Sequence, residues 1–150
     1  YLEHVNARPA AWPEADFIVG NPPYLGNKRM REVFGDGYVD ALRRAYPEVP
    51  DSVDYVMYWW WRAAKAVASR RTIRAGLITT NSITQLTHQP LVRDAAARGA
   101  HVVWATPDHP WADDSDAAAV RVAMTVLAGP SSRAEHLEVD DMGHVVRRVW

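Results

Sequence analysis

Residues 16–24 read Asp-Phe-Ile-Val-Gly-Asn-Pro-Pro-Tyr, and this stretch decides the fold class. The apolar run at 16–20 has the length of a buried strand, and the two prolines end it because proline offers no N–H for strand pairing. In open α/β sheets, ligands bind beyond the carboxyl ends of the strands. The stretch therefore predicts one strand of such a sheet and, directly after it, a loop where a binding site is expected.

Apolar strands alternate with helices through the rest of the chain. The longest periodic segment, 52–69, carries an apolar stripe at helical spacing. This alternation favours an α/β protein with a mixed, mostly parallel sheet and flanking helices. Two short apolar runs around a turn that contains Gly143 predict an antiparallel hairpin at the end of the sheet. The predicted helices cover 39–46, 52–69 and 90–98, and the predicted strands cover 16–20, 75–80, 101–105, 120–127, 137–139 and 144–149.

The composition excludes several classes of protein. The 150 residues suit a single domain, and the absence of cysteine excludes a disulfide scaffold and a thiol nucleophile. The six histidines show no ligand spacing, so no metal site is expected. No signal peptide or apolar run of about 18 residues occurs, so we expect a cytoplasmic protein without a membrane span. With 17 basic and 18 acidic residues, any contact with nucleic acid must come from local patches.

Asn21, Pro22, Pro23 and Tyr24 carry the most specific chemistry. The prolines hold the loop rigid, Asn21 offers a side-chain carbonyl as an acceptor, and Tyr24 offers a flat ring. Together they suit a planar substrate that bears an amino group, with acceptors for its hydrogens and an aromatic face for stacking. The alternative is a plain Pro-Pro turn with Tyr24 packed on the surface.

Each of the remaining candidates has a structural alternative. Trp60 and Trp61 fall in the apolar stripe and are expected in the core, whereas Trp59 is expected to line a groove. Trp111, in a loop, either stacks on the substrate ring or anchors its loop. Asp54 either contacts a cofactor or caps the helix at 52–69. Three basic residues follow the loop and either contact DNA phosphates or form a solvated basic face: Lys28, Arg29 and Arg31. Three polar residues follow the strand at 75–80 and either contact substrate or bond within a turn: Asn81, Ser82 and Thr84.

Residues 16–24 resemble motif IV of the amino-methyltransferases, Rossmann-like enzymes that use S-adenosylmethionine. The helix that holds Asp54 resembles motif V, and residues 76–82 resemble motif VI. Residues 108–111, followed by 118–124, resemble the motif VII–VIII region of MmeI-like DNA adenine methyltransferases. The resemblance covers residues 14–128, and motif IV is its most diagnostic part.

The resemblance implies transfer of a methyl group to the exocyclic amine of an adenine flipped out of double-stranded DNA. By this resemblance, Asn21 and the carbonyl of Pro22 hold the amine, Tyr24 stacks on the flipped base, and Trp111 is a candidate for its second face. Asn21 and Asp54 are the implied contacts with S-adenosylmethionine. Lys28, Arg29 and Arg31 would lie where the DNA phosphates pass.

Motif order implies that this chain is one part of a restriction–modification enzyme. The glycine-containing motif I, which binds most of the cofactor in this family, is absent, and so is a target-recognition region. We therefore expect residues 1–129 to form the catalytic half from motif IV to motif VIII. Residues 130–150 form a hairpin that leads towards a downstream region, and the isolated chain is expected to be inactive. The alternatives are a methyltransferase of a release-factor glutamine or a ribosomal guanine, and an inactive DNA-binding remnant.

Overall fold

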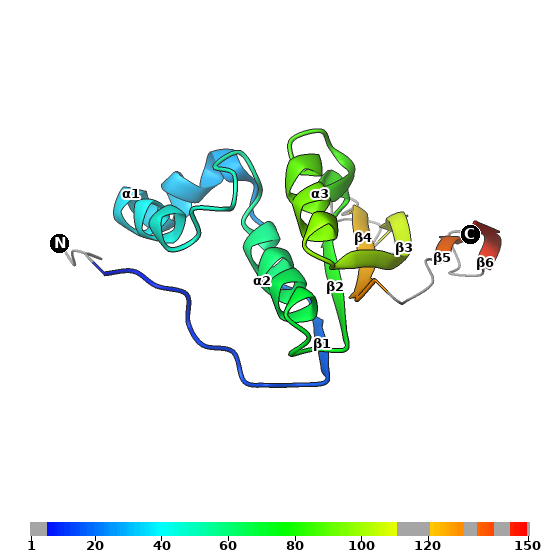
Figure 1. Cartoon of the computed structure of the whole chain (residues 1–150). Helices are drawn as coiled ribbons and strands as arrows, with labels where there is room; N and C mark the ends of the chain where they lie inside the picture. The colour runs from blue at the N-terminus through cyan, green and yellow to red at the C-terminus, as the bar shows by residue number, and fades with distance from the viewer. Residues whose placement is uncertain (1–5, 111–120, 131–134, 140–144, 150) are drawn as a thin grey trace.

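The computed structural model describes residues 6–110, 121–130, 135–139 and 145–149, and each predicted strand and helix is present in it (Figure 1). The helices are α1 (Asn27–Ala45), α2 (Val56–Ala68) and α3 (Gln89–Ala97), with a short 3-10 helix η1 (Asn81–Thr84). The strands are β1 (Phe17–Gly20), β2 (Arg74–Thr80), β3 (His101–Pro110), β4 (Arg121–Ala128), β5 (Glu135–Val139) and β6 (Val145–Val149).

The strands form one mixed sheet in the order β1-β2-β4-β3-β5-β6. The mixed sheet, the flanking helices and the antiparallel end (β5 with β6) are confirmed. The parallel share is smaller than predicted, because β4 lies between β2 and β3 and is antiparallel to both. A parallel neighbour needs a crossover of about a dozen residues or more, usually through a helix. Only residues 111–120 separate β3 from β4, so β4 returns antiparallel.

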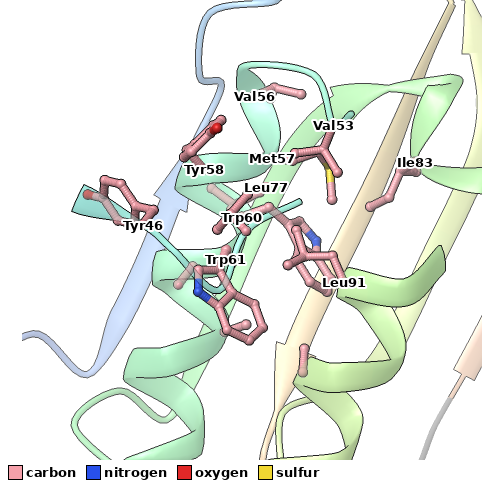
Figure 2. Packing of buried hydrophobic residues seen from close by; sticks show 14 of the residues in the cluster. Tyr46, Val53, Val56, Met57, Tyr58, Trp60, Trp61, Leu77, Ile83 and Leu91 are labelled. Atoms are coloured by element: carbon pink, nitrogen blue, oxygen red, sulfur yellow. The ribbon is translucent and has the colours of Figure 1, made fainter. Parts of the chain in front are cut away.

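The core lies between one face of the sheet and the helices α2 and α3 (Figure 1, Figure 2). Trp60 and Trp61 of α2 are fully buried, as their place in the apolar stripe predicted. The indole N–H of Trp60 donates to the hydroxyl of Thr125 over 3.1 Å, and that of Trp61 donates to Oε1 of Glu48 over 3.1 Å. Both buried indoles are therefore hydrogen-bonded, as most buried polar groups in proteins are.

Helix α1 is longer than the predicted segment 39–46 and begins directly after the Pro-Pro loop. It is kinked at Gly35, whose φ of 77° lies in the left-handed region that glycine enters without steric cost. Gly99, with a φ of 95°, follows the C-cap of α3, where the sequence predicted that this helix stops. Among the described residues, no helix is long and apolar enough to cross a membrane.

The second face of the sheet carries apolar side chains that the described helices do not cover. Val19, Gly76, Val126 and Trp104 pair in one row across β1, β2, β4 and β3, and Val19 is 87% exposed. β1 pairs only with β2 in the described part of the chain and so forms one edge of the sheet.

Candidate functional site

Asn21 and Asn81 directly follow the carboxyl ends of two neighbouring strands, β1 and β2. The end of β3 reaches the same end of the sheet, because Val122 pairs with both Thr80 of β2 and His109 of β3. The loop at 21–24 and the turn at 81–84 therefore share one side of the molecule, as expected for carboxyl ends of strands.

Asn21 and Tyr24 are joined within the loop. The hydroxyl of Tyr24 donates a hydrogen bond to Oδ1 of Asn21. Asn21 and Pro23 are exposed, Pro22 is buried, and the half-buried ring of Tyr24 packs against the core. Burial raises the pKa of the Tyr24 hydroxyl, and its hydrogen bond to Asn21 offsets this only in part. The hydroxyl is therefore a neutral donor near pH 7.

The far end of this loop is tied to the start of α2. The N–H of Tyr55 donates to the carbonyl of Leu25 over 2.9 Å, and the N–H of Asn27 donates to Oδ1 of Asp54 over 2.9 Å. The other carboxylate oxygen, Oδ2, accepts from the hydroxyl of Ser82 over 2.7 Å. The Asp54 carboxylate thus connects the turn after β1 to the turn after β2.

These bonds correct one prediction, that Asp54 caps its own helix. The N-cap of α2 is Tyr55, and no side-chain hydrogen bond caps that helix. The carboxylate instead accepts the N–H of the first residue of α1, Asn27, which is one of the donors that a helix start leaves unpaired. Asp54 therefore stabilises the start of a different helix, 27 residues earlier in the chain.

A hollow of about 420 Å³ opens beside Asn21 and Pro22. Trp59 lines this hollow, as predicted from the sequence. Its ring packs edge-on against Tyr55, with ring centroids 4.4 Å apart. Trp12, from the segment before β1, lines the hollow as well. Aromatic and apolar walls next to a polar amide are typical of sites for small planar ligands.

The predicted basic residues differ in what surrounds them. Lys28, Arg29 and Arg31 are all exposed at the start of α1. Arg31 is held by two carboxylates, with Nη1 2.7 Å from Asp36 and Nη2 2.8 Å from Asp40. Arg29 makes only a long contact, because its Nε lies 3.9 Å from Glu32. Arg31 is therefore the least suited of the three to meet a phosphate.

Asp108 is a polar junction to which sequence reasoning gave no role. It has a left-handed φ of 55°, in a part of β3 where the register with β4 shifts. Its Oδ1 accepts from the amide of Asn81 over 2.9 Å and from Nε of Arg121 over 2.5 Å. The backbone carbonyl of Asn81 accepts from the Thr84 hydroxyl over 2.8 Å, which confirms the predicted bonding within that turn. In the sequence, Asp108 lies beyond the predicted strand at 101–105, and its signal is its place in residues 108–111, which resemble part of the motif VII–VIII region.

Two other predictions concern Trp111 and metal ions. Trp111 lies outside the described residues. The residues that are described contain no group of three His, Cys, Asp or Glu side chains that could hold a metal ion.

Comparison with known proteins matches the chain to a family model and to individual proteins. The profile of the family described as "MmeI, DNA-methyltransferase domain" matches residues 2–138. A protein of Bacillus subtilis (strain 168) named "DNA methyltransferase A" is 24% identical over 151 aligned positions, which cover 99% of this chain and 17% of that protein. The structure of the Type IIL restriction-modification enzyme MmeI in complex with DNA aligns with a TM-score of 0.68 at 22% identity, over 99% of this chain and 19% of that one. The chain thus spans less than a fifth of either relative.

Proposed function

Because the chain belongs to the MmeI DNA-methyltransferase domain family, we propose that it is the substrate-handling part of a DNA adenine methyltransferase in a restriction–modification system. The reaction would transfer a methyl group to the exocyclic amine of an adenine flipped out of double-stranded DNA. The observation that carries this proposal is the position of Asn21, exposed at the end of β1 and bonded to Tyr24 in a proline-fixed loop.

Asn21 and Pro22 would act on the amine by accepting its hydrogens. The lone pair of an aromatic amine is delocalised into the ring, so the nitrogen is a poor nucleophile. Two acceptors that hold both hydrogens favour a pyramidal nitrogen with a localised, directed lone pair. Oδ1 of Asn21 has two acceptor positions, and Tyr24 occupies one of them, so the second is free for the amine.

Tyr24 and Pro23 would hold the base in place. Pro23 keeps the loop rigid, and the Tyr24 ring would stack on the flipped base, an interaction worth about 1–3 kcal/mol. Trp111 is proposed for the second face of the base by family resemblance alone. The reaction needs no perturbed general base beforehand, since the amine proton becomes acidic only after the methyl group has been transferred.

S-adenosylmethionine would supply an activated methyl group when bound beside this loop. Asn21 fits such a contact, because it is exposed next to the aromatic hollow at the edge strand. The expected contact of Asp54 with the cofactor stays a prediction, because each oxygen of its carboxylate accepts one hydrogen bond within the fold and keeps a second acceptor position. Most of the cofactor site is assigned to an upstream region of a longer protein.

Lys28 and Arg29, at the start of the helix that follows the loop, would contact the DNA phosphates.

Residues 1–129 would form the catalytic half. The strands β5 and β6 extend its sheet, and would lead towards a target-recognition region. A cytoplasmic setting, where bacterial DNA is found, belongs to the same proposal.

The decisive experiment incubates the complete protein that carries this chain with labelled S-adenosylmethionine and three acceptors: double-stranded DNA, ribosomal RNA and a release factor. We expect label in DNA alone, on N6 of adenine after digestion to nucleosides. Label on a release-factor glutamine or a ribosomal guanine would replace the proposed substrate. DNA binding without transfer to any acceptor would identify an inactive remnant.

A further inference from the structure

A closed ring of hydrogen bonds joins His88, Asp54 and Ser82 next to the 21–26 loop, which is the whole connection between β1 and α1. The Ser82 hydroxyl donates to Oδ2 of Asp54 over 2.7 Å, and the Asp54 N–H donates to Nε2 of His88 over 3.0 Å. The ring closes between Nδ1 of His88 and the carbonyl oxygen of Ser82, which are 2.6 Å apart. Each of the three residues is therefore held by the other two.

The partners of His88 fix its tautomer. A carbonyl oxygen can only accept, so Nδ1 carries the hydrogen that it donates to Ser82. Nε2 then carries the lone pair that accepts the Asp54 N–H. The side chain is 2% exposed and His88 stands at the N-cap of α3, so water does not compete for these bonds. The buried imidazole thus joins the turn after β2 to Asp54, two residues before α2.

The Asp54 carboxylate connects the ring to the loop. Oδ1 of Asp54 accepts the N–H of Asn27, and beside it the N–H of Tyr55 donates to the carbonyl of Leu25. The loop is stiff between Pro22 and Pro23. Fixing its far end at Leu25 and Asn27 therefore fixes the direction in which Asn21 and Tyr24 point.

We propose that Asp54 is a positioning residue, oriented by His88 and Ser82, which clamps the 21–26 loop in the arrangement that presents Asn21 and Tyr24. Its catalytic consequence rests on the proposed function, whereas the clamp itself is a property of the fold. Since Asp54 would act through the loop, its loss should lower the rate of methyl transfer and leave the affinities for DNA and S-adenosylmethionine nearly unchanged.

The test compares variants of the complete protein in two measurements, amide hydrogen exchange and single-turnover methyl transfer at saturating substrates. Asp54→Ala removes the clamp. Asp54→Asn keeps an oxygen for the Asn27 N–H, and its amide can donate to the Ser82 hydroxyl. Ser82→Ala removes one bond of the ring, together with the hydrogen bond between the Ser82 and Thr80 hydroxyls. Thr72→Val is the matched control, because it removes a hydrogen bond of 3.0 Å to the Ala15 carbonyl near the opposite end of β2.

In Asp54→Ala we expect exchange at the Asn27 and Tyr55 amides to rise about tenfold or more, because their partners are lost or displaced. The transfer rate should fall about tenfold or more, with dissociation constants within about threefold of the parent. Asp54→Asn should recover most of both losses, and Ser82→Ala should lie between the two. Thr72→Val should leave both measurements at the parent values even where its thermal midpoint is lower.

Three results would overturn the clamp. The first is unchanged exchange at Asn27 in Asp54→Ala. The second is a selective loss of S-adenosylmethionine affinity, which would make Asp54 a cofactor contact. The third is a rate loss in Thr72→Val equal to that in Asp54→Ala, which would make the effect one of general stability. A parent protein that transfers no methyl group would refute the proposed function, and the exchange measurement would still decide whether the clamp exists.

Discussion

The Tyr24 hydroxyl donates a hydrogen bond to the side-chain oxygen of Asn21, so the acceptor proposed for the substrate is already oriented by its neighbour. An exposed asparagine amide ordinarily rotates and can exchange its oxygen and nitrogen positions. The bond from Tyr24 sets the oxygen, and Pro22 and Pro23 between them keep the two residues at a constant separation. The Tyr24 side chain thus has two separable parts, the ring and the hydroxyl.

Tyr24→Phe and Tyr24→Ala separate these two parts. Phenylalanine keeps the ring for stacking and loses only the orientation of Asn21, so we expect the transfer rate to fall by less than about tenfold. Alanine loses the stack as well, worth about 1–3 kcal/mol, and should weaken binding of DNA that carries a flipped base. Fluorescence of 2-aminopurine at the target position reports base flipping in both variants. Equal behaviour of the two would assign no role to the ring.

Asn21→Ala should abolish methyl transfer. Both acceptor positions of Oδ1 are lost, while no buried contact is removed, because Asn21 is exposed. We expect a rate at least about a hundredfold lower in single-turnover assays and an unchanged thermal midpoint. DNA affinity, measured by fluorescence anisotropy, should stay within about threefold of the parent. Retained transfer would remove Asn21 from the proposed site.

Charge removal at the start of α1 should affect DNA binding unequally. Lys28→Ala and Arg29→Ala should each weaken binding and reduce the slope of log affinity against log salt by about 1, as expected for one phosphate contact. Arg31→Ala should leave the slope unchanged, because its guanidinium is held by Asp36 and Asp40. Titrations at several salt concentrations measure the three slopes. A reduced slope for Arg31→Ala would mean that DNA displaces those two carboxylates.

Adjacent tryptophans of α2 should differ in their contribution to stability. Trp60 is fully buried, so Trp60→Ala should lower the free energy of unfolding by about 3–5 kcal/mol, a large part of the stability of a typical domain. Trp59 is only half-buried and lines the hollow beside Asn21, so Trp59→Ala should cost about 1 kcal/mol and chiefly weaken substrate binding. Urea unfolding and binding titrations measure the two effects. A reversed order would refute this placement of the two rings.

Glu48 should make part of the stability depend on pH. Burial alone would raise the pKa of Glu48, but hydrogen bonds from Lys65 and Trp61 outweigh it and hold the pKa below the ordinary value of 4.5. The charged form is therefore favoured in the folded state, and its contribution is present above about pH 4.5 and lost as the pH falls through the lower folded value. The partly exposed pair should contribute less than about 1 kcal/mol.

Glu48→Gln measures this contribution. The difference in unfolding free energy between the parent and this variant should be larger near pH 7 than near pH 3 in urea titrations. A difference that is the same at both values would mean that the carboxylate charge contributes nothing.

The sequence predicted the elements whose signals are local. The apolar run before Asn21 and the stripe that contains Trp60 specify β1 and α2 through burial alone. The prediction failed where a breaking residue is accommodated inside an element. Gly35 bends α1 without ending it, and β3 continues past Pro107 through a register shift at which Asp108 takes a left-handed conformation.

The site residues likewise divide into those that a local sequence pattern identifies and those that it does not. The residues from Asn21 to Tyr24 were identified because they are contiguous and their chemistry is unusual. The roles of Asp54 and His88 were not identified, because their partners are distant in the sequence. The Asp54 N–H donates to the His88 imidazole, 34 residues later, and the Asp54 carboxylate accepts from the Asn27 N–H, 27 residues earlier. Such pairings follow from the order of strands in the sheet, which no local pattern encodes.

The place of β4 has a consequence for how the chain is made. β4 lies between β2 and β3 but leaves the ribosome after both. On the nascent chain, residues 101–110 therefore have no described strand to pair with until residues 121–128 have emerged. The centre of the sheet therefore closes only after β4 has emerged, and until then β3 carries unpaired backbone groups that a chaperone can bind.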